Sequence, residues 1–349
     1  MASPPDLTPR IATEIAAEGP IPVERFMAEA NAHYYATRDP LGAAGDFITA
    51  PEISQMFGEI VGLALAEVWD RAGRPNAAYV ELGPGRGTLA TDALRAMAVA
   101  GLKPPVHLVE TSPLLRGLQR DRHALAQWHD GVRTLPADRP LLIVANEFFD
   151  ALPIRQFVMT LTGWRERMVA DGADGFEAVP GGSARLADIP QNLRNADPGG
   201  IVEQCPAARS IAEALGARLA RQGGVLLAFD YGYAAGAHGD TLQAVHAHAY
   251  ADPFARPGSS DLTAHVDFAA LGQAADAGGA RICGPVEQGQ WLIALGLSDR
   301  AAALARGAPN RADEIAAAYR RLTDAEEMGS LFKVMAFVSP RWPDPAGFA

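Results

Sequence analysis

Lysine, cysteine and long apolar runs are all scarce in this chain of 349 residues. Only Lys103 and Lys333 are lysines among its 30 basic residues, so arginine supplies nearly all of the positive charge. Acidic residues number 41, which leaves a formal net charge of -11. Because a nucleic-acid-binding protein needs clustered cations to neutralise phosphates, this balance argues against nucleic acid as a partner.

The two cysteines, Cys205 and Cys283, lie too far apart for a CxxC site and are too few for a disulfide framework. They suit a reducing compartment. The eight histidines show no ligand spacing with acids or cysteines, so we predict no metal site.

Long apolar segments are also missing. The longest runs, such as 141–145, fall far short of the ~18 residues that a membrane span needs. The segment 1–20 carries acids and prolines, without the apolar stretch of a signal peptide or the arginine-rich, acid-poor character of a transit peptide. These features predict a cytoplasmic protein with no membrane insertion.

What the chain does have is 48% hydrophobic residues against 20% charged residues, enough to bury a large core. This composition excludes disorder, collagen and coiled coil as the main architecture. From residue 78 onward, short apolar segments alternate with amphipathic ones, which predicts a doubly wound α/β fold of about seven strands. The strands are expected at 78–82, 106–110, near Val132, 141–145, 225–229, 280–283 and 331–338, and the helices at 88–100, 114–128, 207–221 and 267–277.

Further segments surround this alternation. Residues 1–77 are expected to form an N-terminal helical cap, whose best helix runs from Pro51 to Gly73. We assign 78–349 to the main domain, with a hairpin insertion at 154–205 and a long loop without periodicity at 231–263. Loops of this length in a compact domain are usually functional or mobile.

A glycine loop, ELGPGRGT at 81–88, joins the first expected strand to a helix. Its glycines, Gly83, Gly85 and Gly87, let a ligand approach the backbone closely. The spacing is G-x-G-x-G rather than the G-x-G-x-x-G of dinucleotide sites, and Pro84 removes an N–H that a phosphate would use. The loop therefore favours a nucleoside ligand without phosphate, such as S-adenosylmethionine (SAM), over a plain tight turn.

Glu110 ends the second expected strand, and Thr111-Ser112-Pro113 starts the next helix. A carboxylate at this point accepts hydrogen bonds from both ribose hydroxyls of a nucleotide. The alternative is a helix-terminal charge that interacts with the helix dipole. Since NAD enzymes place an acid here as well, Glu110 supports adenosine binding without choosing the cofactor.

The segment NEFFDALP at 146–153 follows the fourth expected strand, near the point where ligands bind in open α/β sheets. Asn146, Glu147 and Asp150 with two phenylalanines suit a planar nitrogen group, since acids bind its hydrogens and rings cover its face. An Asx-type turn with both phenylalanines in the core is the alternative.

Two further motifs have strong structural explanations. In GDFITAPE at 45–52, Thr49 or Ala50 can cap a helix whose first turn holds Glu52, but capping does not explain Asp46. In DLTAHVDF at 261–268, Asp261 or Thr263 can cap the next helix.

These motifs together resemble one family of SAM-dependent methyltransferases, that of the mitochondrial complex I assembly arginine methyltransferase and its bacterial relatives (the MidA family). The resemblance extends from about residue 20 to about 340. It rests on GDFITAPEIS, QMFGE, VELGPGRGTL, VETSP, NEFFDALP, FDYG and DLTAHVDF in family order. It implies a class I methyltransferase fold with a Rossmann-like, seven-stranded sheet, and a cytoplasmic location for a bacterial member.

The resemblance also implies roles for individual residues. Asp46, Asn146, Glu147 and Asp150 would face the target. The SAM-binding residues would be Thr49, Glu52, Glu81, Gly83, Gly85, Gly87, Glu110 and Ser112. The reaction implied is symmetric dimethylation of an arginine on the quinone-site hydrophilic subunit of NADH dehydrogenase, and a homodimer is a possible assembly.

Our mechanistic hypothesis is that Glu147 and Asp46 hold the guanidinium group, with Asp150 or Asn146 orienting them. Three alternatives stay open. The acceptor can be another protein, a small molecule or, against the charge balance, RNA. The chain can bind SAM as an assembly factor without turnover. An NAD-dependent dehydrogenase is disfavoured by the spacing of the glycine loop and by Pro84.

Overall fold

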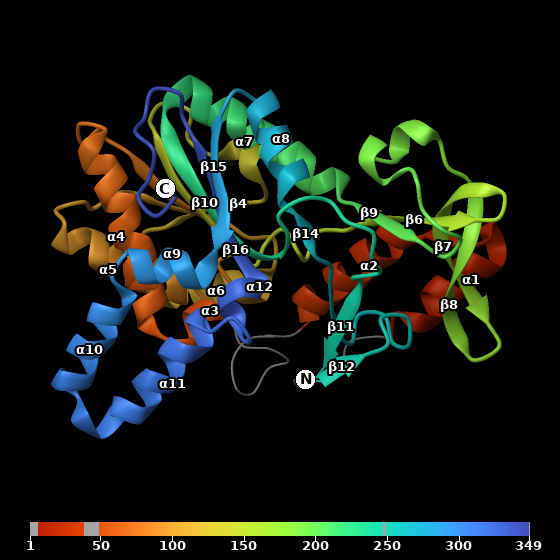
Figure 1. The fold of residues 1–349 in the computed structure, drawn as a ribbon. Coiled ribbons are helices and arrows are strands. Elements are labelled where there is room, and N and C mark those ends of the chain that lie inside the picture. Colours follow the sequence, from red (N-terminus) through yellow and green to blue (C-terminus); the bar gives the residue numbers. More distant parts are fainter. Residues whose placement is uncertain (1–5, 38–48, 247–248, 349) are drawn as a thin grey trace.

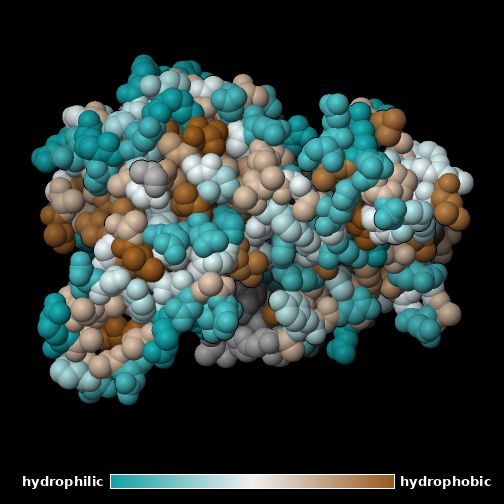
Figure 2. Space-filling model, in the orientation of Figure 1, coloured by the Kyte–Doolittle hydropathy of each residue, from teal (hydrophilic) through white to brown (hydrophobic). Residues whose placement is uncertain are grey.

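The computed structural model describes residues 6–37, 49–246 and 249–348. Its ribbon consists of two lobes (Figure 1). The larger lobe is built around a central sheet flanked by helices, and the smaller one is built around hairpin strands and the first helices of the chain. Figure 2 shows hydrophilic and hydrophobic residues intermixed on one face, with a hollow between the lobes at its upper edge.

The central sheet has the strand order β15-β16-β10-β5-β2-β3-β4, and a two-residue strand, β14, pairs with β10. All pairings are parallel except those of β16, which runs antiparallel to both neighbours. The strands are β2 (Ala78–Leu82), β3 (Val106–Val109), β4 (Gln127–His129), β5 (Leu141–Asn146), β10 (Gly224–Tyr233), β14 (Val266–Asp267), β15 (Arg281–Glu287) and β16 (Phe332–Val338). This confirms the doubly wound α/β class.

The strand order reverses between β2 and β5, because the chain adds β3 and β4 on one side and β10 on the other. At such a switch point the loops after neighbouring strands diverge and leave a crevice at the carboxyl ends. The glycine loop and the segment after β5 both start there, so the topology brings the two strongest sequence motifs together.

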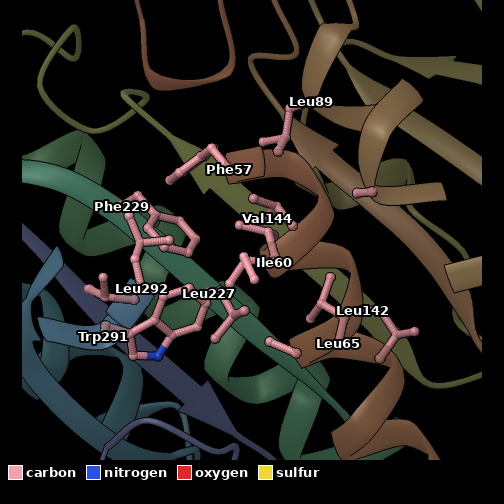
Figure 3. Close-up of a cluster of buried hydrophobic side chains, with 14 of the residues drawn as sticks. Phe57, Ile60, Leu65, Leu89, Leu142, Val144, Leu227, Phe229, Trp291 and Leu292 are labelled. Carbon is pink, nitrogen blue, oxygen red and sulfur yellow. The ribbon is translucent and has the colours of Figure 1, made fainter. Parts of the chain in front are cut away.

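Helices cover both faces of the sheet, and β5 is apolar because it is buried on both sides. Leu142 and Val144 face one cluster, where α4 (Gln55–Arg71), α5 (Thr88–Val99) and α9 (Gln288–Ala294) pack, as Figure 3 shows for Phe57, Ile60 and Trp291. The intervening residues of β5 face the second cluster, with α7 (Pro206–Gln222) and α8 (Phe268–Ala277). Every apolar residue of the strand therefore packs into one of the two layers.

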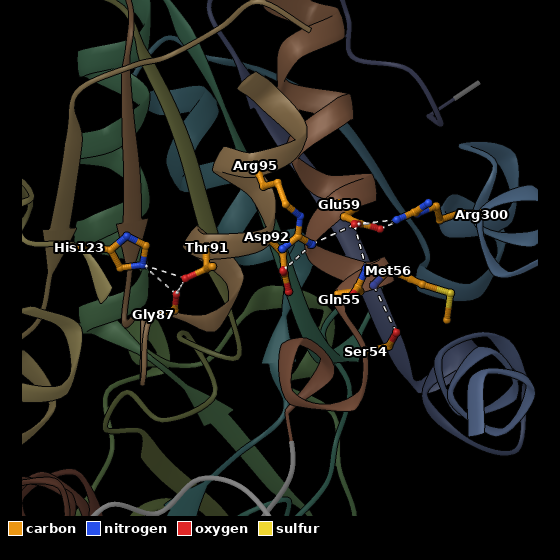
Figure 4. A network of polar contacts seen from close by, with 10 residues as sticks. All are labelled: Ser54, Gln55, Met56, Glu59, Gly87, Thr91, Asp92, Arg95, His123 and Arg300. Carbon is orange, nitrogen blue, oxygen red and sulfur yellow. Dashed lines mark hydrogen bonds and ion pairs between the residues drawn. The ribbon is translucent and has the colours of Figure 1, made fainter. Parts of the chain in front are cut away.

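An ion-pair network joins α4 and α5 to α10 (Leu297–Gly307) (Figure 4). The carboxylate of Glu59 is almost fully buried and accepts hydrogen bonds from Arg300 at 2.6 Å and from Arg95 at 2.9 Å. Burial alone penalises its charge, but the two guanidinium groups hold the pKa of Glu59 below its ordinary value. The remaining helices near this end are α3 (Ala50–Ile53), α6 (Pro113–Arg122), α11 (Ala312–Thr323) and α12 (Met328–Leu331).

The smaller lobe combines the N-terminal helices with the hairpin insertion. Its core brings Phe26 and Met27 of α2 against Val169 and Phe176 of the hairpins. Strand β1 pairs with β7, so the first helices lie on the insertion rather than beside α4. The elements are α1 (Thr8–Glu18), β1 (Ile21–Pro22), α2 (Val23–Thr37), β6 (Arg155–Thr160), β7 (Gly163–Gly172), β8 (Gly175–Ser183) and β9 (Ile201–Gln204).

Three sequence predictions were wrong. The third strand is β4, since Val132 begins a short 3-10 helix (Val132–Thr134), and the helix expected to reach residue 128 ends at Arg122. The segment 231–263 is not a plain loop, because it contains the end of β10 and the strands β11 (Gln243–His246), β12 (Ala249–Ala251) and β13 (Asp261–Thr263). These strands have at most four residues, too few to show a period of two.

The cap of α8 also differs from the prediction. Asp267 accepts a hydrogen bond from the N–H of Ala270 at 3.0 Å, whereas Asp261 and Thr263 belong to β13. The other short helices are Leu186–Asp188, Gln191–Leu193 and Pro309–Arg311. Among the described helices, none combines the length and apolar character that a bilayer crossing demands.

Candidate active site

A cavity of about 530 Å³ lies at the carboxyl ends of β2, β3 and β5. Both lobes line it, because α2 contributes one wall and the loops after the three strands contribute the rest. Nine of the predicted site residues line it: Thr49, Glu52, Glu81, Gly83, Gly85, Glu110, Ser112, Asn146 and Glu147. Gly87 and Asp150 are not among the lining residues, and Asp46 lies outside the part of the chain that the structure describes.

The three glycines of the loop all adopt the left-handed backbone conformation. Gly83, Gly85 and Gly87 have φ values of 60°, 53° and 79°. A Cβ at Gly83 would lie 3.0 Å from the ring of Phe148, so the loop also needs the missing side chain there. Gly87 instead packs against His123, whose Nε2 lies 2.9 Å from the Gly87 carbonyl oxygen (Figure 4). Gly87 therefore supports the loop through its contact with His123 and does not line the cavity.

Two carboxyl groups line the cavity at the ends of β2 and β3, Glu81 and Glu110. Glu81 is buried and accepts a hydrogen bond of 2.6 Å from the hydroxyl of Tyr79, and burial raises the pKa of Glu81 to about 8. Glu110 accepts hydrogen bonds from the N–H of Ser112 at 2.8 Å and from Gln119 at 3.3 Å. Burial raises the pKa of Glu110 as well.

Gln119 was missed by the sequence analysis. Its amide donates to the Gly85 carbonyl at 2.7 Å and accepts from the indole N–H of Trp128 at 2.8 Å, in addition to its bond with Glu110. The side chain therefore ties the glycine loop to the acid that follows β3. No pattern in the sequence identifies a helical glutamine for this role.

Thr49 precedes the short helix α3 at the edge of the cavity, and Glu52 belongs to it. Thr49 makes no capping bond with its side chain. Glu52 accepts a hydrogen bond of 2.6 Å from Thr88, the first residue of α5, and lies 3.9 Å from the guanidinium of Arg86. Glu52 thus connects α3 to the glycine loop.

Glu147 lies at the end of β5 in a conformation that is unusual for its residue type. Its φ is 49°, and its carboxylate accepts hydrogen bonds of 3.1 Å from both the Ala50 N–H and the Asn146 amide. Left-handed backbone at a non-glycine residue costs about 1–3 kcal/mol and gathers at functional sites. Burial, together with the charge of Asp150, raises the pKa of Glu147 to about 8.

Near Glu147 lie two buried acids, Asp150 and Asp230. Asp230 accepts hydrogen bonds from the N–H groups of Phe149 at 3.0 Å and Asp150 at 3.3 Å, which fixes the turn after Glu147. Burial raises the pKa of Asp150 to about 6 and that of Asp230 well above its ordinary value. Tyr231 hydrogen-bonds with Asp150.

This acid cluster of Glu147, Asp150 and Asp230 has no cation in contact with it within the described ranges. No described lysine or arginine forms an ion pair with any of the three, although the charge of Arg321 on α11 acts on Glu147 from farther away. One oxygen of Asn146 and one of Asp150 are buried without a hydrogen-bond partner. Buried polar atoms in this state are suited to a ligand that donates hydrogen bonds and carries positive charge.

The donor set of the cavity fits SAM. Glu110 can accept from ribose hydroxyls, and the glycine loop admits a ligand close to the backbone without offering the N–H of residue 84 to a phosphate. No three histidine, cysteine or acidic side chains of the described chain come together as a metal ion would require.

The fold and this cavity define a SAM-dependent methyltransferase. Comparisons with known proteins show that the chain belongs to a family of S-adenosyl-L-methionine-dependent methyltransferases, whose model matches residues 60–286. Protein arginine methyltransferase NDUFAF7 is a relative: the Drosophila melanogaster homolog is 35% identical, covering 95% of this chain and 84% of its own, and that of Mus musculus is 35% identical, covering 93% and 82%.

A solved structure agrees with this assignment. The crystal structure of a methyl transferase superfamily member from Burkholderia thailandensis, bound to S-adenosyl-homocysteine, superimposes with a TM-score of 0.86 at 30% identity. The match covers 98% of this chain and 94% of that chain. The prediction of a SAM-dependent enzyme is therefore confirmed.

Proposed function

We propose that this enzyme methylates arginine side chains of a protein, with symmetric dimethylation of the quinone-site hydrophilic subunit of NADH dehydrogenase as the reaction. The observation that carries the proposal is the acid cluster beside the end of β5, in which the partly buried Glu147 lies near the buried Asp150 and Asp230 with no contacting cation among the described residues. The names of the curated relatives support a protein arginine as acceptor.

A guanidinium group keeps its proton at any ordinary pH because its pKa exceeds ~12. It is therefore a poor nucleophile until its charge is drawn to one side. In our proposal, Glu147 and the free oxygen of Asn146 bind one edge of the group and leave the opposite nitrogen richer in electrons. Asp46 remains a proposed partner of Glu147.

SAM supplies a methyl group that its positive sulfur already activates. The residues of the chain hold the acceptor nitrogen in line with the C–S bond that breaks, and they exclude water from the site. As the N–C bond forms and the C–S bond breaks, the nitrogen loses one proton, which the carboxylate of Glu147 accepts. The charge of Asp150 acts on Glu147. Asp230 fixes the backbone of the turn that carries Asp150, because it accepts a hydrogen bond from the N–H of Asp150.

We further propose a division of labour between the parts of the chain. Residues 78–349 supply most of the SAM site, with Thr49 and Glu52 added from the helical region 1–77. The rest of that region, the insertion 154–205 and the segment 231–263 recognise the acceptor protein. The support is that α2 and the hairpin strands share one core and that α2 also lines the cavity.

The test incubates the protein with methyl-labelled SAM and the quinone-site subunit, followed by mass spectrometry of arginine peptides. We expect label on arginine, and we expect E147Q to lower the rate at least ~100-fold while SAM affinity stays within about threefold. E81Q is the matched control, since Glu81 is another carboxyl group of the same cavity whose pKa is raised to about 8; it should weaken SAM binding instead.

Two results would count against the proposal. Absence of label from every arginine of the subunit would remove the proposed reaction and leave SAM binding without this turnover. Loss of SAM affinity in E147Q would make Glu147 a cofactor residue and remove its role toward the acceptor.

A further inference from the structure

Helix α2 presents one face to the cavity, with residues at three- and four-residue spacing. Ala28, Asn31, Ala32, Tyr35 and Ala36 all line the cavity. The three alanines leave room, so Tyr35 is the one large side chain that the described part of α2 adds to this wall. The other aromatic residue of the lining, Phe148, lies against Gly83 on the side of the glycine loop.

Tyr35 bonds to residues on two sides of the cavity, Ser112 and Asp261. Its backbone carbonyl accepts a hydrogen bond of 2.7 Å from Ser112, whose N–H donates to Glu110. Its hydroxyl hydrogen-bonds with Asp261 of β13, and the charge of Asp150 also acts on it. Burial and these acids raise the pKa of Tyr35 well above its ordinary value, so the phenol keeps its proton and donates.

Asn31, one turn before Tyr35, holds this arrangement in place. Its buried amide donates to the carbonyls of Ala151 at 3.0 Å and Leu262 at 2.8 Å, and accepts from the Leu262 N–H at 3.0 Å. One side chain thereby joins α2 to the segment that carries Asp150 and to the strand that carries Asp261. The ring of Tyr34 packs at 5.3 Å and 81° against that of Tyr35.

A guanidinium group has hydrogen-bond donors along its edges and two flat faces that are weakly hydrated. Carboxylates and amides satisfy the edges, and an aromatic ring satisfies a face. Glu147 and Asn146 supply the first kind of contact, and Tyr35 lines the same cavity, within reach of the charge of Asp150, to supply the second.

We propose that Tyr35 recognises the acceptor, packing its ring on the guanidinium face while Asp261 anchors its hydroxyl. This inference rests on the proposed function and adds a specificity-determining residue to it. It also gives the DLTAHVDF motif a role, since Asp261 is its first residue. A lysine ammonium has no flat face, so the ring favours arginine over lysine.

The experiment titrates the full chain, loaded with S-adenosyl-homocysteine, with Nα-acetyl-arginine N-methylamide and with its lysine counterpart, observed by NMR. We expect the wild-type protein to bind the arginine amide more tightly. Y35L should weaken that binding about tenfold, and Y35F should stay within about threefold because it keeps the ring. Y250L is the matched control, since Tyr250 is 80% exposed on β12 and should behave as wild type.

Affinity for S-adenosyl-homocysteine reports on folding and should stay within twofold in all variants. If wild type prefers arginine and Y35L binds it equally well, the role of Tyr35 is wrong while the proposed function stands. If Y35L instead loses S-adenosyl-homocysteine, Tyr35 serves the cofactor and the inference is again overturned. If wild type shows no preference for arginine, the proposed function itself fails, and this inference with it.

Discussion

Glu59 and Glu147 show two environments for a carboxyl group that is fully or partly removed from solvent. Glu59 is bonded by two guanidinium groups, so it stays charged and joins three helices (Figure 4). Glu147 has two hydrogen bonds but no contacting cation among the described residues, and two more acids lie near it. The negative charge of Glu59 is balanced by cations of the protein itself, whereas the carboxyl groups around Glu147 are balanced only when a cationic ligand binds.

The raised pKa of Glu147 predicts how stability depends on pH. The folded protein holds this proton up to a pKa of about 8, whereas the unfolded chain releases it near the ordinary value of 4.5. Between these values the folded state binds the extra proton, so stability falls by ~1.4 kcal/mol per pH unit, and above about 8 the loss is complete. Since glutamine does not titrate, the wild type should lose ~2–3 kcal/mol relative to E147Q from pH 6 to pH 8.

Urea denaturation of both proteins in the absence of acceptor measures this difference. Stability curves that run parallel across the pH range would show that Glu147 is already ionised in the free protein, and the uncompensated acid cluster would then be the wrong description.

At the scale of elements, the contact between α4 and α5 positions the glycine loop. Gly58 and Gly62 lie one turn apart on α4, and a Cβ at Gly62 would lie 2.4 Å from the carbonyl oxygen of Ala93. The helices approach so closely only because these side chains are absent. Since α5 starts at Thr88, directly after the loop, a shift of this helix moves the cofactor site.

Replacing Gly62 with alanine should therefore affect both folding and binding. The added methyl meets backbone, which cannot rotate away, so we expect a loss of ~2–3 kcal/mol in the free energy of unfolding and weaker SAM binding. The matched control is G117A in the interior of α6, where a Cβ meets nothing within 4 Å and alanine should stabilise by ~0.5–1 kcal/mol. Urea denaturation and calorimetry measure the two effects, and unchanged values for G62A would mean that the helices separate at no cost.

The elements that sequence predicted well are those with a strong local pattern. The apolar strand β5, the glycine loop and the amphipathic helix α4 each encode their conformation in neighbouring residues. Strands β4, β11, β12 and β13 are fixed by their partners in the sheet, and single-sequence patterns do not show partners.

The residues of the candidate site also fall into a group that the sequence predicts and a group that it does not. Glu110, Asn146 and Glu147 follow strand ends, so their convergence on one cavity follows from the fold class. Gln119, Asp230 and Asn31 act through tertiary contacts, up to 231 residues apart in the case of Asn31 and Leu262. Such contacts have no sequence period, and only the structure identifies them.

On the scale of the whole molecule, the cavity is shared by lobes that have separate cores. Asn31 and Tyr35 belong to α2, which packs on the hairpin strands, yet they bond to Ala151 and Ser112 of the larger lobe. A ligand that contacts both the glycine loop and α2 is therefore expected to stabilise the contact between the lobes, by as much as it binds more tightly when the lobes are in contact. The hairpin of α10 and α11 lies at the opposite end of the ribbon from the hairpin strands (Figure 1).

Hydrogen–deuterium exchange should detect this coupling. On binding S-adenosyl-homocysteine, we expect slower exchange in 81–88 and 110–115, because these segments line the cavity, and also in 23–37, because α2 closes it from the other lobe. Exchange in 297–323 should not change, since no residue of α10 or α11 lines the cavity. N31A should remove the protection of 23–37 and keep that of 81–88, because it breaks the bonds that tie α2 to Ala151 and Leu262. Protection confined to the larger lobe in the wild type would show that the two lobes bind their ligands independently.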